Sequence, residues 1–386
     1  MTKKVSTPAL RFKGFTYTWE QRRLGEIATE MVAGGDIDKD LILDEGCYPV
    51  IANALTNDGI VGYYNSDYRI IVPAVTVTGR GDIGHAKARI INFTPVVRLL
   101  SIKSNHDVFF LENAINTLKI VIESTGVPQL TVPQLAKYEI SFPKSLDEEE
   151  RIGTYFRNLD RLITLHQHKY DKLTNMKKSM LEKMFPKNGA NVPEIRFKGF
   201  TDAWEQRKLK EVVNVYDGVH QTPDYKDSGV MFLSVENISI LKSEKYISEE
   251  AFQKDYKVYP QKGDVLMTRI GDVGTPNVVE TTEKVAFYVS LALLKPTKIN
   301  SYFLCNSIQS PLFQKGLKDR TLVTAIPQKI NKDEIGKVNI ILPASSQEQQ
   351  LIGEYFRNLD RLITLHQREL EKLKNLKKAC LEKMFV

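Results

Sequence analysis

The chain has 386 residues, of which 42% are hydrophobic and 26% are charged, and its net charge at pH 7 is +7. This length and composition predict two or three domains with real cores, and the mildly basic charge permits a polyanionic partner. Three widely spaced cysteines, no apolar signal core and no membrane-length run exclude a disulfide scaffold, a secreted precursor and a membrane protein, so we expect a soluble, cytoplasmic protein.

A short segment near the start of the chain is repeated later. Residues 8–22 read PALRFKGFTYTWEQR, and residues 193–207 read PEIRFKGFTDAWEQR. Two copies this similar indicate internal duplication, which then governs the rest of the prediction.

Each short segment is followed by a body of more than 100 residues that reads as β-rich. Apolar and β-branched runs at 68–77, 96–102 and 338–342 are bounded by Gly, Pro, Asn and Asp, as strands are. Two short motifs occur in similar form in both bodies. RGDIGHA at 80–86 matches IGDVGTP at 270–276, and VPQL at 127–130 matches IPQK at 326–329. The bodies otherwise differ much more than the parts that frame them.

Each body leads into a long helical pattern. The stretch YFRNLDRLITLHQ occurs without change at 155–167 and 355–367. Around it, apolar residues step by four and three, which is the seam of a coiled coil. We expect the two helices to pack antiparallel, with facing residue numbers adding to about 536. The polar seam residues His166, His366, Lys177 and Lys377 are expected to set register and find a neighbour.

The chain is therefore predicted to be a tandem duplication with six parts. They are an N-terminal segment (1–22), a first body (23–143), a central long helix (144–187), the repeated segment (188–207), a second body (208–343) and a C-terminal long helix (344–386). The first segment is expected to sit beyond the second helix as its copy sits beyond the first, which brings the two termini together.

This pattern resembles the specificity subunits of type I restriction–modification systems over essentially the whole chain. The resemblance rests on the paired FKGF…WEQR segments, the identical YFRNLDRLITLHQ helices, their shared LEKMF ends and the helix starts, where DEEER in the first copy departs from SQEQQ in the second. It implies an α+β fold in which two β-rich target recognition domains are separated by two long antiparallel coiled-coil helices.

The resemblance also implies a function. The chain would be a non-catalytic subunit that recognises a bipartite, asymmetric double-stranded DNA site, one half per recognition domain. It would hold two methyltransferase subunits and, through them, the restriction subunits. No cofactor is expected on this chain; S-adenosylmethionine, ATP and Mg belong on the partner subunits.

Candidate DNA contacts cluster around the two Gly-Asp-x-Gly turns and the two Pro-Gln elements. Arginine pairs with guanine, and Asn or Gln with adenine, in the major groove. The candidates are Arg80, Lys87, Arg89 and Gln129 in the first body, and His220, Gln221, Arg269, Thr275, Asn277, Gln328 and Lys329 in the second. The same turns could instead be ordinary strand connections.

Two other functions stay open at this stage. One is a coiled-coil scaffold or dimerisation protein whose bodies bind protein or carbohydrate, and the other is an enzyme with an unrecognised site. Methyltransferase and phosphate-loop motifs are absent, and Asp224 with Asp255-Tyr256-Lys257 only loosely imitates a nuclease site. Near-identical frames around divergent bodies favour the DNA-recognition function, because one scaffold then presents two specificities.

The helix pair is expected to act as a ruler for the gap between the half-sites. Two equivalent readers on one face of a duplex require half-sites roughly 10 base pairs apart, which leaves an unread spacer of about six. Inserting one heptad into both helices adds about 10 Å and should lengthen the spacer by about three base pairs. Mapping of methylated sites measures this; an unchanged spacer with retained activity, or altered half-sites, would contradict it.

Overall fold

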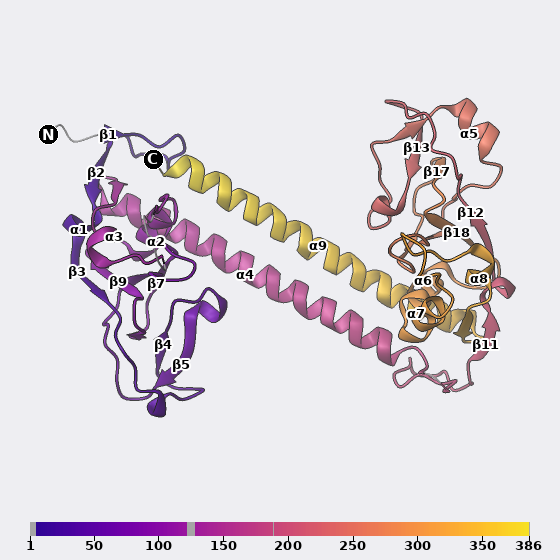
Figure 1. The fold of residues 1–386 in the computed structure, drawn as a ribbon, viewed down its shortest axis with the longest axis horizontal. Coiled ribbons are helices and arrows are strands. Elements are labelled where there is room, and N and C mark those ends of the chain that lie inside the picture. Colours follow the sequence, from indigo (N-terminus) through magenta and orange to yellow (C-terminus); the bar gives the residue numbers. More distant parts are fainter. Residues whose placement is uncertain (1–4, 122–127, 188, 386) are drawn as a thin grey trace. The chain divides into compact units, whose positions relative to one another are not determined.

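The computed structural model describes residues 5–121, 128–187 and 189–385, which form two compact units (Figure 1). Unit 1 comprises residues 1–167 and 367–386, and unit 2 comprises residues 168–366. Each unit therefore contains one body, one short segment and part of each long helix. Among the described residues, no helix is long and apolar enough to cross a membrane.

Unit 1 contains three small sheets and several short helices. The sheet β1-β2-β10 joins Val5–Ser6, Trp19–Arg23 and Glu139–Phe142. The sheet β3-β9-β6-β7 joins Ala28–Ala33, Leu100–Ser104, Ala74–Val77 and Ala86–Arg89, all antiparallel. The sheet β5-β4-β8 joins Ile60–Tyr64, Tyr48–Ile51 and Thr94–Pro95. The short helices are α1 (Leu24–Ile27), α2 (Val108–Asn116) and α3 (Val132–Leu135), with 3-10 turns at Lys39–Leu41 and Thr56–Gly59.

Unit 2 repeats this plan. The pair β11-β19 joins Glu205–Lys208 and Asn339–Leu342. The sheet β12-β18-β15-β16 joins Val213–Asp217, Leu291–Pro296, Val265–Thr268 and Pro276–Val278, and β14-β13-β17 joins Tyr246–Ile247, Val230–Leu233 and Val285–Phe287. The helices are α5 (Glu249–Asp255), α6 (Ser301–Gln309), α7 (Pro311–Lys318) and α8 (Lys332–Gly336), with 3-10 turns at Leu209–Glu211 and Val235–Asn237.

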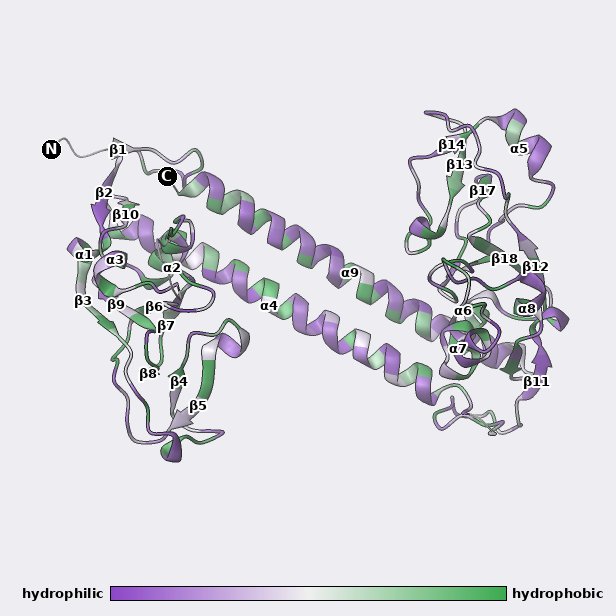
Figure 2. Cartoon of the chain, viewed as in Figure 1, coloured by the Kyte–Doolittle hydropathy of each residue, from purple (hydrophilic) through white to green (hydrophobic). Residues whose placement is uncertain are grey.

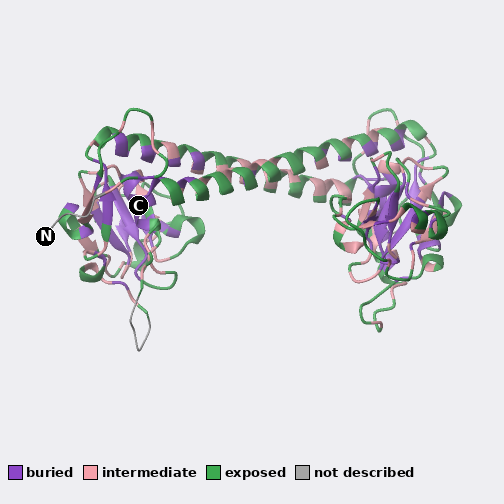
Figure 3. Cartoon of the chain, turned by 90° about the horizontal axis from the view of Figure 1, so that it is seen from above, coloured by how far each residue is buried: buried purple, intermediate pink, exposed green. Residues whose placement is uncertain are grey.

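The two bodies share a strand plan although their sequences differ. Both contain a four-stranded antiparallel sheet, and both contain a three-stranded sheet with one parallel pair, β4 with β8 and β13 with β17. Figure 3 shows that buried residues concentrate on the strands within each body. The expected β-rich bodies and the α+β fold are confirmed. The duplication extends through the bodies as well as through the frame, which consists of the two short segments (8–22 and 193–207) and the two long helices (146–183 and 346–384).

The expected strands are shorter than the apolar runs that suggested them. The run 68–77 forms a strand only from Ala74, because Pro73 has no backbone N–H to donate to a ladder. The run 96–102 forms one only from Leu100, because Arg98 adopts a positive φ of 72° that extended backbone does not allow.

The long helices are α4 (Leu146–Lys183) and α9 (Ser346–Met384). Apolar residues recur along both between polar ones (Figure 2). The positions of the predicted seam are buried or half-buried throughout, whereas their neighbours in the middle of each helix are mostly exposed. The seam therefore faces inward, as a coiled coil requires.

Within each unit, the segments of α4 and α9 pack antiparallel. In unit 1 the Tyr155 hydroxyl lies 3.5 Å from the Cys380 sulfur, and the Lys377 Nζ lies 2.6 Å from a carboxylate oxygen of Asp160. In unit 2 the Lys177 Nζ lies 2.7 Å from an Asp360 oxygen. The numbers in each pair add to within one of 536, so the expected antiparallel register is confirmed.

The two short segments occupy equivalent places in the two units. The backbone N–H of Leu10 donates to the Lys383 carbonyl in unit 1, and that of Ile195 donates to the Lys183 carbonyl in unit 2, each at 2.9 Å. The first segment thus holds the end of α9 as the second holds the end of α4. This confirms the expected position of the N-terminal segment.

A buried ion pair fastens each segment to the start of the other long helix of its unit. Arg11 Nη2 donates to a Glu148 oxygen at 2.7 Å, and Arg196 Nε donates to a Glu348 oxygen at 2.6 Å. The side chains of Arg11 and Glu148 are only 10% and 1% exposed. Two paired charges this deep are costly to separate.

Substitution of Arg11 tests this fastening. Arg11→Met should lower the free energy of unfolding of unit 1 by about 3–5 kcal/mol, because the Glu148 carboxylate stays buried without its counter-charge. Adding Glu148→Leu should recover most of the loss. Arg23→Met, at a half-exposed pair with Glu139, is the control and should cost less than about 1 kcal/mol. Denaturant titration measures all three; equal losses in the single and double variants would contradict the ion-pair account.

A circular permutant tests the position of the N-terminal segment. A chain opened after Lys187, with a short linker from Val386 to Met1, keeps every contact between the first segment and the end of α9. We expect it to fold with about the stability of the parent chain. Circular dichroism and denaturant titration measure the outcome, and a permutant that does not fold would refute this arrangement.

Candidate nucleic-acid interface

In unit 1 the Gly-Asp-Ile-Gly turn and the Pro-Gln element lie side by side. The turn connects β6 to β7 and is closed by bonds from the Gly84 N–H to the Thr78 carbonyl at 2.8 Å and from the Thr78 N–H to the His85 carbonyl at 3.0 Å. Arg80 forms a β-bridge with Gln129, and the Leu130 N–H donates to the Gly79 carbonyl at 2.9 Å. Two motifs separated in sequence thus share one edge.

Unit 2 builds the same edge from different residues. Its turn connects β15 to β16, and the Gly271 N–H donates to the Gln328 carbonyl at 2.8 Å. Ile270 forms a β-bridge with Lys329, and the Ile330 N–H donates to the Arg269 carbonyl at 3.0 Å. The turn glycines have positive φ, for example 74° at Gly81 and 81° at Gly271, which explains why glycine recurs there.

The β-bridge that each turn forms with its Pro-Gln element corrects the sequence alignment of the two Pro-Gln elements. The motif match aligns Gln129 with Gln328. In the structure Arg80 and Ile270 are equivalent, and their bridge partners are Gln129 and Lys329. The match by letters is therefore out of step by one residue, because pairing with the turn, and not the motif itself, fixes the register of this segment.

Several candidates in unit 2 are engaged inside the protein. Arg269 is 5% exposed; its Nε donates to the Ile330 carbonyl at 3.0 Å and its guanidinium pairs with Asp217. Asn277 donates to the Ile238 carbonyl at 2.8 Å, and Thr275 donates to Asp272 at 2.6 Å. These side chains tie the turn to its surroundings, and base contact by them stays a prediction.

Gln328 is bonded within the protein and is also exposed to solvent. Its Nε2 donates to the Gly271 carbonyl at 2.9 Å, yet the residue is exposed. Its amide oxygen and the second hydrogen of Nε2 remain for an external partner.

Other candidates are open to solvent. Arg80, His220, Gln221 and Lys329 are exposed, and their side chains make no hydrogen bond or ion pair with any other residue that the structure describes. Gln129 is half-buried beside Arg80. Charged and amide side chains of this kind are available to bases or phosphates without breaking an internal bond.

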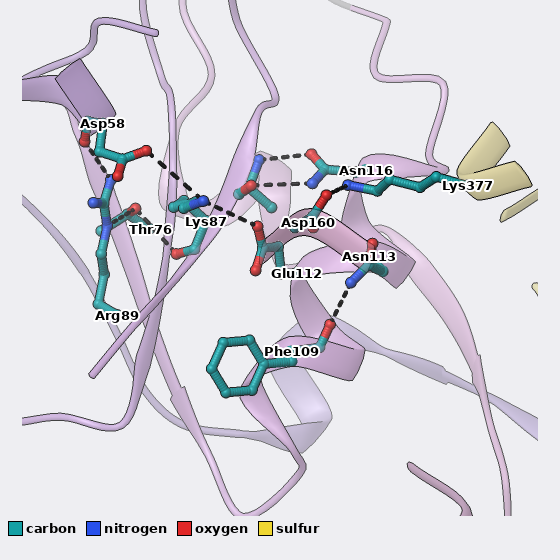
Figure 4. A network of polar contacts seen from close by, with 11 residues as sticks. Asp58, Thr76, Lys87, Arg89, Phe109, Glu112, Asn113, Asn116, Asp160 and Lys377 are labelled. Carbon is teal, nitrogen blue, oxygen red and sulfur yellow. Dashed lines mark hydrogen bonds and ion pairs between the residues drawn. The ribbon is translucent and has the colours of Figure 1, made fainter. Parts of the chain in front are cut away.

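Lys87 and Arg89 belong to a polar network in unit 1 that Figure 4 shows. Lys87 Nζ lies 3.7 Å from Asp58 and 3.9 Å from Glu112, and Arg89 donates to the Thr76 hydroxyl at 3.0 Å. Burial lowers the pKa of the Arg89 guanidinium and raises the pKa of the Glu112 carboxyl. Lys87 is still 46% exposed, so it can reach an external phosphate, whereas Arg89 chiefly fixes β7.

The network continues to the long helices. Asn116 at the end of α2 makes two bonds to the backbone of Ala86 in β7, at 2.8 and 3.0 Å. Close by, Asp160 of α4 pairs with Lys377 of α9 (Figure 4). In unit 1, α2 therefore bonds to β7, and the Asp160–Lys377 pair of the long helices lies beside this contact.

Two supporting residues escaped the sequence analysis. Asn53 accepts from the Gly79 N–H at 2.8 Å, and Asp217 pairs with Arg269. Their partners lie 26 and 52 residues away, so no local pattern could reveal them. Among the described residues, no group of three His, Cys, Asp or Glu side chains could hold a metal ion.

Comparison with known proteins identifies the family. A family model described as the type I restriction modification DNA specificity domain matches residues 17–175 and 201–375. The chain belongs to this family. The two matches each cover one body and most of the helix that follows it, so this specificity subunit carries the family's domain twice.

Individual proteins agree. The type I restriction enzyme MjaVIII specificity subunit of Methanocaldococcus jannaschii is 24% identical over 390 residues, which cover 93% of this chain and 90% of that protein. The putative type I specificity subunit S.MpnORF507P of Mycoplasma pneumoniae is 28% identical over 34% of this chain and 38% of its own length. The S subunit structure from M. genitalium has the same fold, with a TM-score of 0.74, 16% identity and 99% of both chains covered.

Two arginines beside the turns of the specificity subunit should behave oppositely. Arg269→Ala should destabilise unit 2 by about 3 kcal/mol. The substitution leaves the mostly buried Asp217 carboxylate without its counter-charge and the Ile330 carbonyl without its donor. Arg80→Ala should change stability by less than about 0.5 kcal/mol and weaken DNA binding by the complex. Thermal unfolding and duplex binding separate the two effects; a destabilised Arg80→Ala protein with unchanged DNA affinity would contradict this division.

Proposed function

We propose that this specificity subunit recognises a bipartite, asymmetric double-stranded DNA site, with one half-site read by each body. The chain is a DNA-recognition subunit without catalytic activity of its own. The observation that carries the finer proposal is the paired turn edge, built on one strand plan in both bodies but bearing different side chains. Equivalent positions present Arg80 and Gln129 in one body and Ile270 and Lys329 in the other. Different donors at one place select different bases.

Arg80 and Gln129 are proposed as base contacts in the first half-site, with Lys87 on a phosphate. His220, Gln221, Gln328 and Lys329 are proposed for the second half-site. Arg89, Arg269, Thr275 and Asn277 are proposed to position these residues, because their polar groups already bond within the protein.

The frame supports two copies of one partner. The identical stretches 155–167 and 355–367 present the same surface in each unit, including Leu162 and Leu165 and their copies Leu362 and Leu365, all of which remain exposed. Repeated identical surfaces suit repeated identical subunits. We propose that two methyltransferase subunits bind the frame and that restriction subunits join through them. S-adenosylmethionine, ATP and Mg would be bound by these partners, and the complex would work in the cytoplasm.

The scaffold that binds protein or carbohydrate finds no support in the comparisons. Every relative reported above is a type I specificity subunit.

Half-site independence is the test of this function. In cells that carry the chain and its methyltransferase subunits, Arg80→Ala should relax the first half-site only, and Lys329→Ala should change recognition at the second only. Loss of a base contact should cost about 1–3 kcal/mol at one position, whereas loss of a phosphate contact should weaken all sites evenly and lower the salt slope by about one. Genome-wide mapping of methylated sites measures this; changes in both half-sites from one substitution would count against independent readers.

A further inference from the structure

The hairpin from Leu322 to Lys329 in unit 2 carries an apolar tip in the solvent. Leu322 is 45% exposed, Val323 is 65% exposed and Ile326 is 100% exposed. Among the residues that the structure describes, no other large hydrophobic side chain is as exposed as Ile326. Single exposed leucines are ordinary on proteins, but three apolar side chains on one hairpin form a candidate contact surface.

Hydrogen bonds fix the base of this hairpin, so the exposure of its tip belongs to a defined conformation. The Leu322 N–H donates to the Lys329 carbonyl at 2.8 Å and closes the hairpin. Gln328 is bonded to Gly271 through both its backbone carbonyl and its side-chain amide. Arg269 donates to the carbonyl of Ile330, the first residue after the hairpin. The hairpin is thereby fixed to the Gly-Asp-Val-Gly turn, and the tip residues 323–327 project from that junction.

The charge around the tip suits a polyanion. Residues 314–334 contain five basic side chains, Lys315, Lys318, Arg320, Lys329 and Lys332, against three acidic ones, Asp319, Asp333 and Glu334. Asp272 lies in the adjoining turn. A protein partner that buried the apolar tip would also have to neutralise these charges. A DNA duplex supplies phosphates for the lysines and thymine methyl groups for the apolar tip.

We propose that Ile326, supported by Val323, determines specificity by contacting the C5-methyl group of a thymine in the second half-site. The proposal rests on the DNA-recognition function above. The thymine methyl is the apolar group that base pairs display in the major groove. Gln328 and Lys329, two and three residues further along the same hairpin, bear the amide and ammonium groups that pair with adenine and guanine edges or with phosphate in that groove.

A minor-groove wedge is the competing mode for an apolar tip. Such a side chain enters between base steps and unstacks them. The polar neighbours on this hairpin favour the major groove, because the minor groove offers few distinct acceptors to them. The two modes differ in what they do to the bases, so the test below distinguishes them.

The experiment uses the full chain assembled with its methyltransferase subunits and duplexes that carry the mapped recognition site. Each thymine of the second half-site is replaced in turn by deoxyuridine, which lacks only the methyl group. The proteins are the parent, Ile326→Val, Ile326→Ala and Leu41→Ala. Leu41 is 63% exposed but lies in unit 1, so it controls for loss of an exposed apolar side chain.

At one position, deoxyuridine should weaken binding by the parent complex about three- to fivefold, the effect of one buried methyl group. Ile326→Ala should bind the thymine duplex roughly tenfold more weakly and should no longer distinguish thymine from deoxyuridine there. Ile326→Val should fall between, and Leu41→Ala should match the parent. All proteins should respond alike to deoxyuridine in the first half-site.

Three results would overturn the proposal. They are a second half-site without thymine on either strand, an equal deoxyuridine effect in the parent and Ile326→Ala, and 2-aminopurine fluorescence showing base unstacking that Ile326→Ala abolishes. Each leaves the DNA-recognition function intact. Loss of that function would show differently, as a parent complex that binds its mapped site no better than unrelated duplex.

Discussion

The structure depends on an aromatic junction that is built twice. In unit 1, Phe385 at the end of α9 lies 5.4 Å from Phe110 and 5.7 Å from Phe156, measured between ring centroids, and 6.3 Å from Trp19. These four rings come from the C-terminal helix, the first body, the central helix and the N-terminal segment. In unit 2, Phe185 meets Phe303, Phe356 and Trp204 in the same way, at 5.5, 6.1 and 6.0 Å. One ring thus joins four parts of the chain in each unit.

The junction explains why the frame is copied so faithfully while the bodies diverge. Aromatic pairs of this geometry contribute about 0.5–1.5 kcal/mol beyond their buried area, and each ring in the cluster constrains its neighbours. Substitution of any one ring would disturb a body, a segment and both helices at once. The turn edges lie outside the junction, so their side chains can vary without loosening the frame, as the DNA-recognition role proposed for them requires.

The sequence was sufficient for the frame because its signals are local. Heptad steps place Lys177 and Lys377 on the seam, and the structure pairs them with Asp360 and Asp160. The duplicated segments place Leu10 at the end of α9 in the way Ile195 sits at the end of α4. The site was less predictable, since the functions of its residues depend on long-range partners. Arg269 bonds to Asp217 and Ile330, which lie more than 50 residues away in the sequence. Gln129 is equivalent to Lys329, not to Gln328. No local sequence pattern predicts either fact.

We propose that one frame presents two interchangeable readers. The most direct measurement is to replace residues 208–343 with a second copy of residues 23–143 and to map methylated sites in cells that also carry the methyltransferase subunits. The account predicts sites composed of two copies of the first half-site, separated by the original spacer. Continued methylation of the original asymmetric site, or methylation that ignores sequence at the substituted half, would contradict it.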